Sequence, residues 1–214
     1  MMKYYKIDFS LIGRYAMPHT IELTSKEVKK YLKDNSFFSS PTFFDDFPEY
    51  VEGKLLKRKN LVDYMETCPF VSSLNSIISD KFKTILEDLN VNKNEYFLRQ
   101  IRIKNFEEQH YYLLFIPYVK KSEIIFPECE FRNDITEEEK IHFKDCESWS
   151  EDHSKYTAKK VVLTSKYKNN DIIFVEFSGL FFSERIVDEL FRNNIVGLEL
   201  ETKGYFYADL VIKE

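Results

Sequence analysis

The chain has 214 residues, 43% of them hydrophobic and 16% aromatic, which is enough apolar material for one sizeable core or two small ones. This composition excludes an intrinsically disordered protein, and the net charge of −5 disfavours a protein whose main task is to bind nucleic acid.

The beginning of the sequence and its longest apolar run argue against export and membrane insertion. Lys3, Lys6 and Asp8 interrupt the apolar centre that a secretory signal needs. The run 111–119 includes Pro117 and is far shorter than the ~20 residues of a membrane-spanning helix. Three cysteines without CxxC spacing fit reduced thiols. We therefore expect a cytoplasmic protein that does not act at a membrane.

Glycine is scarce, and its spacing excludes two common kinds of nucleotide site. No two of the five glycines lie within six residues of each other. A Walker or dinucleotide loop needs several glycines in one short stretch, so that backbone N–H groups can approach the phosphates. We therefore expect no cofactor of these kinds.

The first third of the chain predicts a strand, a helix and an aromatic loop. Residues 3–12 alternate as a strand, and 23–33 have helical spacing with Thr24 and Glu27 placed as a capping box. Residues 35–50 contain two prolines and several Ser and Asp, which break regular structure. This loop also holds five phenylalanines that pin it to the core or form an exposed docking patch, namely Phe37, Phe38, Phe43, Phe44 and Phe47.

One short phrase occurs twice, about a hundred residues apart. Ser79 and Ser183 are each followed by an acid, a base and an apolar stripe at helical spacing. Each hydroxyl is expected to cap a helix, worth about 1 kcal/mol, and Asp80 or Glu184 then favours the positive end of the helix dipole. Asn193 and Asn194 predict the end of the second helix.

Extended runs follow both predicted helices. They are 96–104, 111–118, 196–201 and 205–212. Residues 161–165 and 171–177 predict a hairpin across the polar turn KYKNN. The unit of strand, capped helix and strand thus occurs twice. It predicts an α+β fold with helices packed on a mixed, mostly antiparallel sheet.

No linker separates these units, so residues 1–214 are expected to form a single domain. Residues 1–68 are a possible N-terminal subdomain, and 128–152 form an acidic insert. An alternative role for Ser79 and Ser183 is as nucleophiles. However, no His lies near either copy and the pattern GxSxG is absent, so capping explains them better and no catalytic residue is assigned.

The acidic insert is the candidate recognition surface. It holds ten acids and three bases, a local charge of −7 that leaves the rest of the chain slightly basic, and it contains the single Trp. A helix is expected to begin at Asp134 or Thr136, with Glu137 or Glu139 completing a capping box. The plain alternative is a solvated helix and loop.

As a functional surface, the insert would present an aromatic anchor among carboxylates to a basic partner. The residues predicted to bind that partner are Glu137, Glu138, Glu139, Glu147, Trp149, Glu151 and Asp152. Replacing Trp149 together with Glu147, Glu151 and Asp152 is expected to weaken binding while leaving stability nearly unchanged.

Two further kinds of site are disfavoured. His142, Asp145, Cys146 and His153 supply metal-ligand chemistry, but their spacing matches no structural zinc site, so no metal is assigned. Arg99, Arg102 and Lys104 form at most a short basic strand, which does not predict a nucleic-acid surface.

The segment IIFVEFSGLFFSERIVDELFRNNIVGLELE, with the upstream stretches beginning PFVSSLNSIISDKFKTIL and YYLLFIPYV, resembles the immunity protein 11 family of polymorphic bacterial toxin systems. The resemblance covers about residues 69–125 and 160–203. It implies a non-enzymatic, cytoplasmic antidote that binds and neutralises a cognate toxin, and the charge of the acidic insert favours a basic toxin such as a nuclease. The alternative is an uncharacterised enzyme or ligand-binding domain that uses the acidic insert. The matched positions, which have structural interpretations and leave the toxin-binding surface open, are Ser79, Asp80, Ser183, Glu184, Arg185 and Gly197.

Overall fold

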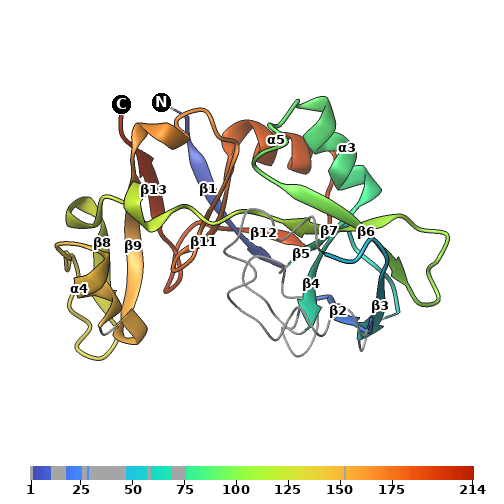
Figure 1. Ribbon diagram of the computed structural model, residues 1–214, viewed down its shortest axis with the longest axis horizontal. Helices are drawn as coiled ribbons and strands as arrows, with labels where there is room; N and C mark the ends of the chain where they lie inside the picture. Colours follow the sequence, from blue (N-terminus) through green and yellow to red (C-terminus); the bar gives the residue numbers. More distant parts are fainter. Residues whose placement is uncertain are drawn as a thin grey trace. The chain divides into compact units, whose positions relative to one another are not determined.

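A computed structural model describes residues 2–10, 18–25, 28, 47–56, 59–68, 76–151 and 153–214 (Figure 1). Its contacts divide the chain into two compact units. The two-sheet unit comprises Met1–Asp8, Tyr118–Val187 and Leu200–Glu214. The barrel unit comprises Phe9–Pro117 and Asp188–Glu199. Both units are discontinuous in sequence, and neither coincides with residues 1–68.

The barrel unit is built on a closed sheet of six strands in the order β2-β3-β6-β7-β5-β4. Their bounds are Thr20–Leu23 (β2), Val51–Leu56 (β3), Tyr64–Cys68 (β4), Ser76–Ser79 (β5), Phe97–Ile103 (β6) and Tyr111–Phe115 (β7). The β2–β4 and β3–β6 pairs are parallel, and the other pairs are antiparallel. Closure pairs both edges of this sheet, which removes the exposed edge strands of an open one.

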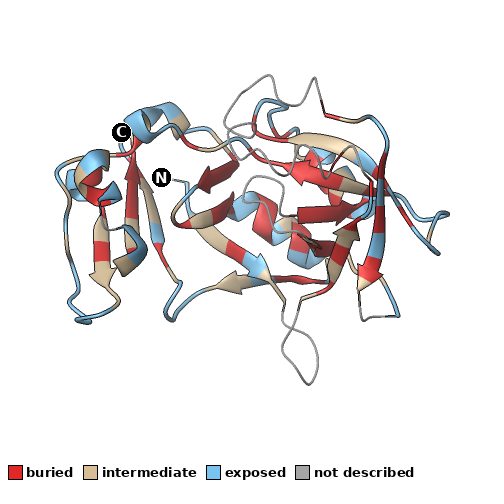
Figure 2. Cartoon of the chain, turned by 60° about the horizontal axis from the view of Figure 1, so that its bottom comes forward, coloured by how far each residue is buried: buried red, intermediate tan, exposed pale blue. Residues whose placement is uncertain are grey.

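Side chains fill the interior of this barrel. Ile21, Met65 and Leu113 belong to one fully buried cluster, and buried positions lie along the barrel strands in Figure 2. At Gly53 a Cβ would lie 2.5 Å from Ile21 Cγ2, so the packing there requires glycine. Phe47 joins the cluster, as predicted. Phe37, Phe38, Phe43 and Phe44, and most of the predicted helix 23–33, lie outside the described residues.

The two-sheet unit contains two sheets, in the orders β10-β11-β1-β12 and β13-β9-β8. Strands β1 and β12 run on into the barrel unit. The strand bounds are Tyr4–Phe9 (β1), Glu130–Asn133 (β8), Tyr156–Leu163 (β9), Ile172–Val175 (β10), Gly179–Ser183 (β11), Leu198–Glu201 (β12) and Asp209–Ile212 (β13). Short helical turns connect them at Lys121–Glu123 (η2), Phe126–Glu128 (η3), Cys146–Ser150 (α4), His153–Lys155 (η4) and Ser165–Tyr167 (η5).

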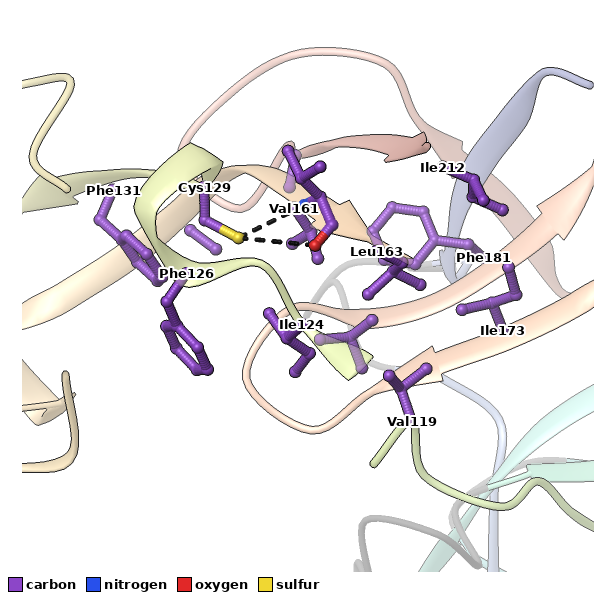
Figure 3. Packing of buried hydrophobic residues seen from close by; sticks show 14 of the residues in the cluster. Val119, Ile124, Phe126, Cys129, Phe131, Val161, Leu163, Ile173, Phe181 and Ile212 are labelled. Carbon is purple, nitrogen blue, oxygen red and sulfur yellow. Dashed lines mark hydrogen bonds between the residues drawn. The ribbon is translucent and has the colours of Figure 1, made fainter. Parts of the chain in front are cut away.

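Both sheets contribute to one core, seen in Figure 3. Phe131 and Leu163 come from the second sheet, and Ile173 and Phe181 come from the first. Within this core the Sγ of Cys129 accepts a hydrogen bond from the N–H of Val162 at 3.3 Å. Burial raises the pKa of the Cys129 thiol to about 11, so this thiol stays protonated and behaves as a core side chain.

The predicted hairpin between 161–165 and 171–177 is wrong. Strand β9 pairs with β8 and β13, whereas β10 pairs with β11. The hairpin turn lies at 176–178, where the N–H of Ser178 donates to the carbonyl of Val175. Gly179 follows with φ +108°, a conformation that L side chains rarely adopt. The polar segment KYKNN does not close a hairpin; its first residues belong to the η5 turn.

The predicted α+β fold with mostly antiparallel pairing is confirmed, as is the repeated unit of strand, helix and strand. Helix α3 (Asp80–Asp88) and helix α5 (Glu184–Arg192) each begin directly after a strand-ending serine. Both helices are short, and no helix among the described residues is long and apolar enough to cross a membrane.

The repetition extends to the hairpin that precedes each helix. In the first module, Ser79 donates its N–H to the carbonyl of Asp63 and its hydroxyl to the Asp63 carboxylate, at 2.9 and 2.7 Å. In the second module, Ser183 makes the same two bonds to Asp171, at 2.8 and 2.6 Å. In each hairpin the aspartate precedes the first strand and the serine ends the second.

The strand on the other side of each serine is matched as well. The N–H of Asp80 donates to the carbonyl of the residue before Tyr111, and the N–H of Glu184 donates to that of the residue before Tyr4. The next tyrosine along each strand then donates its hydroxyl to the first carboxylate of the helix at 3.1 Å, Tyr112 to Asp80 and Tyr5 to Glu184.

The two helices also end in the same way. Asn90 and Asn194 have φ of 52° and 51°, the left-handed conformation of a helix C′ residue. The following N–H groups of Val91 and Ile195 reach back to the carbonyls of Leu86 and Leu190, both at 3.0 Å. These bonds satisfy carbonyls at the helix ends that would otherwise be unpaired.

Candidate functional site

The acidic insert forms strand β8, a long turn and helix α4 in the two-sheet unit. Glu137, Glu138 and Glu139 are exposed in the turn, and Glu147 and Glu151 are exposed at α4. Asp152 lies outside the described residues. Most of the carboxylates predicted to bind a partner therefore face solvent.

The helix predicted at Asp134 or Thr136 is wrong, because residues 134–140 form a turn. Asn133 Oδ1 accepts hydrogen bonds from the N–H groups of Ile135 and Thr136, at 2.8 and 3.0 Å. The Asn133 N–H donates to the carbonyl of Glu138 at 2.8 Å and closes the turn. An Asn side chain that bonds to nearby backbone groups competes with a helix, which explains this difference.

Helix α4 begins later, at Cys146, and its N-terminal cap determines which side chains of the helix face solvent. Asp145 accepts a hydrogen bond from the Ser148 N–H at 2.8 Å, and Ser148 Oγ accepts from the Asp145 N–H at 3.1 Å. The bond from the Ser148 backbone is the main reason that the pKa of Asp145 is lowered. This capping box starts α4 so that Glu147 points to solvent and Trp149 inward.

The expectation that Trp149 is a surface anchor needs correction, because its side chain is only 6% exposed. The indole packs against Phe177 and Phe126, with ring centroids 4.8 and 6.0 Å apart. Among the described residues, its Nε1–H is buried without a hydrogen-bond partner. Trp149 therefore belongs to the core, and we now expect its removal to lower stability.

The four candidate metal ligands each have another role, and Cys146 is partly buried against the core of the two-sheet unit. His142 Nδ1 lies 2.8 Å from the carbonyl oxygen of Cys129, and Asp145 caps α4. The His153 ring packs on Trp149 with centroids 5.4 Å apart. Within the described part of the chain, no group of three or more His, Cys, Asp or Glu side chains is placed to hold a metal ion.

Sequence reasoning missed the aromatic loop beside the acidic turn. The predicted strand 205–212 begins only at Asp209, and residues 202–206 are exposed. The side chains of Tyr205 and Phe206 are 43% and 59% exposed and meet edge to face at 4.8 Å between centroids. The signal in the sequence was Lys203 followed by Gly204, whose φ of +108° favours a turn.

The acidic turn and this loop share one cation. The Arg132 guanidinium carbon lies 5.7 Å from the Tyr205 ring centroid, and Arg132 Nη2 lies 3.6 Å from Glu137 Oε1. Carboxylates and solvent-facing aromatic rings are therefore neighbours on the two-sheet unit. Such a surface is suited to recognition of a protein, because aromatic residues supply contact area and charges supply orientation.

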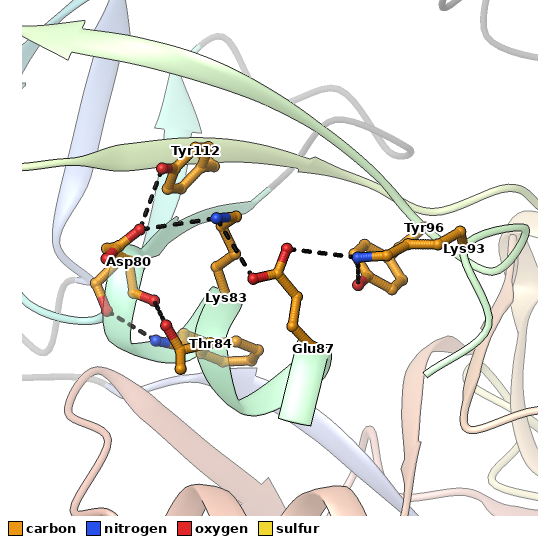
Figure 4. A network of polar contacts seen from close by, with 9 residues as sticks. Asp80, Lys83, Thr84, Glu87, Lys93, Tyr96 and Tyr112 are labelled. Atoms are coloured by element: carbon orange, nitrogen blue, oxygen red, sulfur yellow. Dashed lines mark hydrogen bonds and ion pairs between the residues drawn. The ribbon is translucent and has the colours of Figure 1, made fainter. Parts of the chain in front are cut away.

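Helix α3 carries a different polar surface in the barrel unit, drawn in Figure 4. Lys83 lies 3.5 Å from Glu87 Oε2 and 5.1 Å from the Tyr112 ring centroid. Glu87 also pairs with Lys93 at 3.5 Å. Because its charges are balanced between neighbours on a helix surface, this network fits a role in stability.

A groove of about 570 Å³ lies between α3 and the C-terminal part of α5 in the barrel unit. It is lined by Lys81, Thr84, Ile85, Asp88, Leu89, Glu189 and Asn193. Two acids and one base border it, so its lining favours no single charge class of ligand.

No protein-family model matches the chain, and no curated protein matches it. The resemblance of residues 69–125 and 160–203 to the immunity protein 11 family therefore remains a prediction.

Proposed function

We propose that the chain is a cytoplasmic immunity protein that binds and neutralises a cognate bacterial toxin without catalysis. The resemblance of its two repeated segments to the immunity protein 11 family supplies the class of partner. The observation that supports the proposal is the exposure of the carboxylates of Glu137, Glu138 and Glu139 in the acidic insert. The tryptophan of the insert, Trp149, is buried.

The preferred partner is a basic protein, such as a nuclease. Exposed carboxylates attract a positively charged surface and accelerate the encounter, and they can occupy the positions of nucleic-acid phosphates. The rest of the chain is slightly basic, so the excess of acids is local to the insert.

The surroundings of the two repeated serines support a non-enzymatic role. Ser183 is fully buried, and both Ser79 and Ser183 donate their hydroxyls to an aspartate. A serine nucleophile needs an accessible hydroxyl beside a general base. These hydroxyls instead join a hairpin to the start of a helix.

A titration of toxin activity tests the proposal. The candidate toxin for this test is the C-terminal domain of a secreted protein encoded in an adjacent reading frame, and its own activity is followed as the chain is added. Binding predicts a sharp end point at a fixed molar ratio that does not change with incubation time. Clearance of toxin activity by a small fraction of one equivalent, progressing with time, would show an enzyme instead.

A further inference from the structure

The loop that carries Tyr205 and Phe206 is held by two lysines, Lys6 of β1 and Lys159 of β9. Lys159 Nζ donates to the carbonyl of Gly204 at 3.3 Å and to that of Tyr205. Lys6 Nζ donates to the carbonyl of Phe206 and pairs with Glu201 at 3.3 Å. Three successive carbonyls of the loop are therefore fixed by ammonium groups.

This arrangement presents the rings to solvent in a defined position. The loop backbone is tied down at its carbonyls, while Tyr205 and Phe206 are exposed and pack on each other. A surface ordered before binding loses less conformational entropy when a partner docks. Isolated exposed apolar residues are ordinary on proteins, but an adjacent aromatic pair on a tethered loop forms a patch of the kind found at interfaces.

Charges of both signs lie around the rings. Lys159 Nζ lies 5.4 Å from the Tyr205 ring centroid, on the loop that it tethers. Arg132 joins that ring to Glu137, whose side chain is exposed. Beyond Arg132 the turn presents further exposed carboxylates at Glu138 and Glu139. A docking surface would therefore meet an aromatic pair that has two cations, Lys159 and Arg132, against the Tyr205 ring and exposed carboxylates beyond Arg132.

We infer that Tyr205 and Phe206 are the anchor of the toxin interface, and that they enter an apolar pocket of the toxin, beside which Lys or Arg side chains of the toxin face Glu137, Glu138 and Glu139. This inference rests on the proposed function and names its interface. The carboxylates of Glu137, Glu138 and Glu139 disfavour an anionic membrane or a nucleic acid as the occupant. Aromatic anchors account for most of the binding energy at many interfaces, and rim charges mainly set the association rate.

The test measures binding of the adjacent-frame toxin domain, inactivated by mutation, to variants of the full chain by calorimetry. Tyr205→Ala with Phe206→Ala is expected to weaken binding about 100-fold or more, because two anchors are lost. Phe191→Ala is the matched control, since Phe191 is also half exposed but lies on α5 in the barrel unit. It is expected to change the affinity less than about 3-fold. Thermal melts check that all three chains remain folded.

The rim is tested by association kinetics. Glu137→Gln, Glu138→Gln and Glu139→Gln together are expected to slow association about 3- to 10-fold at low salt and to flatten its salt dependence. An unchanged association rate would remove these carboxylates from the interface.

The outcomes separate the two proposals. If the unmodified chain binds and the Tyr205 and Phe206 double variant binds equally well, the anchor is wrong and the proposed function stands. If the unmodified chain does not bind, the proposed function is overturned and the anchor with it. A second copy of the chain is the alternative partner of the rings, and sedimentation of the chain alone detects it. A dimer that the double variant abolishes would assign the rings to self-association and overturn the toxin interface.

Discussion

The two hairpin–helix modules have nearly the same backbone contacts but differ in how the aspartate is satisfied. In the barrel unit, the second carboxylate oxygen of Asp63 accepts a hydrogen bond from the Val196 N–H at 3.0 Å. In the second module, Arg185 contacts both carboxylate oxygens of Asp171, with Nε at 2.6 Å from Oδ1. Asp171 is 3% exposed, whereas Asp63 is partly exposed.

This difference teaches that the serine–aspartate bond is the constant part of the module and the second partner is adjustable. A neutral backbone donor suffices where water reaches the carboxylate. A buried carboxylate takes a charged partner, because an uncompensated buried charge is costly. The repeated Ser, acid and base of the sequence therefore encode a way to join a hairpin to a helix.

The largest difference between the modules is expected from the aspartates themselves. Asp171→Ala removes a buried charged hub and is expected to lower the free energy of unfolding by about 3 kcal/mol. Asp63→Ala removes a half-buried acceptor of two bonds and is expected to cost about 1.5 kcal/mol. Denaturant unfolding of both variants measures the two losses in the free energy of unfolding. Equal losses would show that burial and the arginine do not distinguish the modules.

The serines are expected to give smaller and more similar effects. Ser79→Ala removes the bond to Asp63 and the cap on the Phe82 N–H, and we expect a loss of about 1–2 kcal/mol. Ser183→Ala removes the buried bond to Asp171, with a similar loss. Both are measured as shifts of the denaturant midpoint with unchanged slope. A stability unchanged in either variant would break the comparison.

The helix ends are expected to respond alike. Asn90 and Asn194 both have positive φ, so replacement of either by Gly is expected to raise stability by a few tenths of a kcal/mol. Replacement by Ala is expected to lower it by about 1 kcal/mol, because Ala is strained there. Thermal unfolding of the four variants compares the two ends. A destabilising Asn→Gly change at one end alone would show that its side chain has a further task.

The smallest effect is expected at the tyrosine that contacts the helix start. Burial, and then the bond to Asp80, raise the pKa of Tyr112 above its usual 10. The folded state therefore favours the protonated phenol, and its stabilisation is complete below pH 10 and is lost as pH rises through the folded pKa. Tyr112→Phe is expected to cost about 0.5 kcal/mol at pH 7 and to reduce this alkaline loss. An alkaline stability profile that is identical in Tyr112→Phe and the unmodified chain would contradict this.

The sequence was informative where local chemistry decides the structure. The segments that begin at Ser79 and Ser183 predicted two helices, because a cap, an acid at the first position and an apolar stripe all lie within a few residues. Long-range pairing was not readable in this way. Strand β9, which contains most of the run 161–165, pairs with β8 and β13 and not with β10, which is nearer in sequence. No local sequence pattern distinguishes these pairing partners.

The candidate site was predicted in part for the same reason. Charge counting found the exposed carboxylates, since charged side chains rarely go inside. Trp149 was misplaced because its pocket is built by Phe126 and Phe177, which are distant in sequence. Tyr205 and Phe206 were read as part of a strand because their apolar character hid the turn at Gly204.

The most direct test of the architectural role of the repeated serine is a pair of double-mutant cycles, Ser183→Ala with Asp171→Ala and Ser79→Ala with Asp63→Ala, measured by denaturant unfolding. Both cycles are expected to show coupling energies of about 1–3 kcal/mol, with the buried pair the larger. A coupling energy near zero in either cycle would contradict the account, since that serine and its aspartate would then stabilise the fold independently.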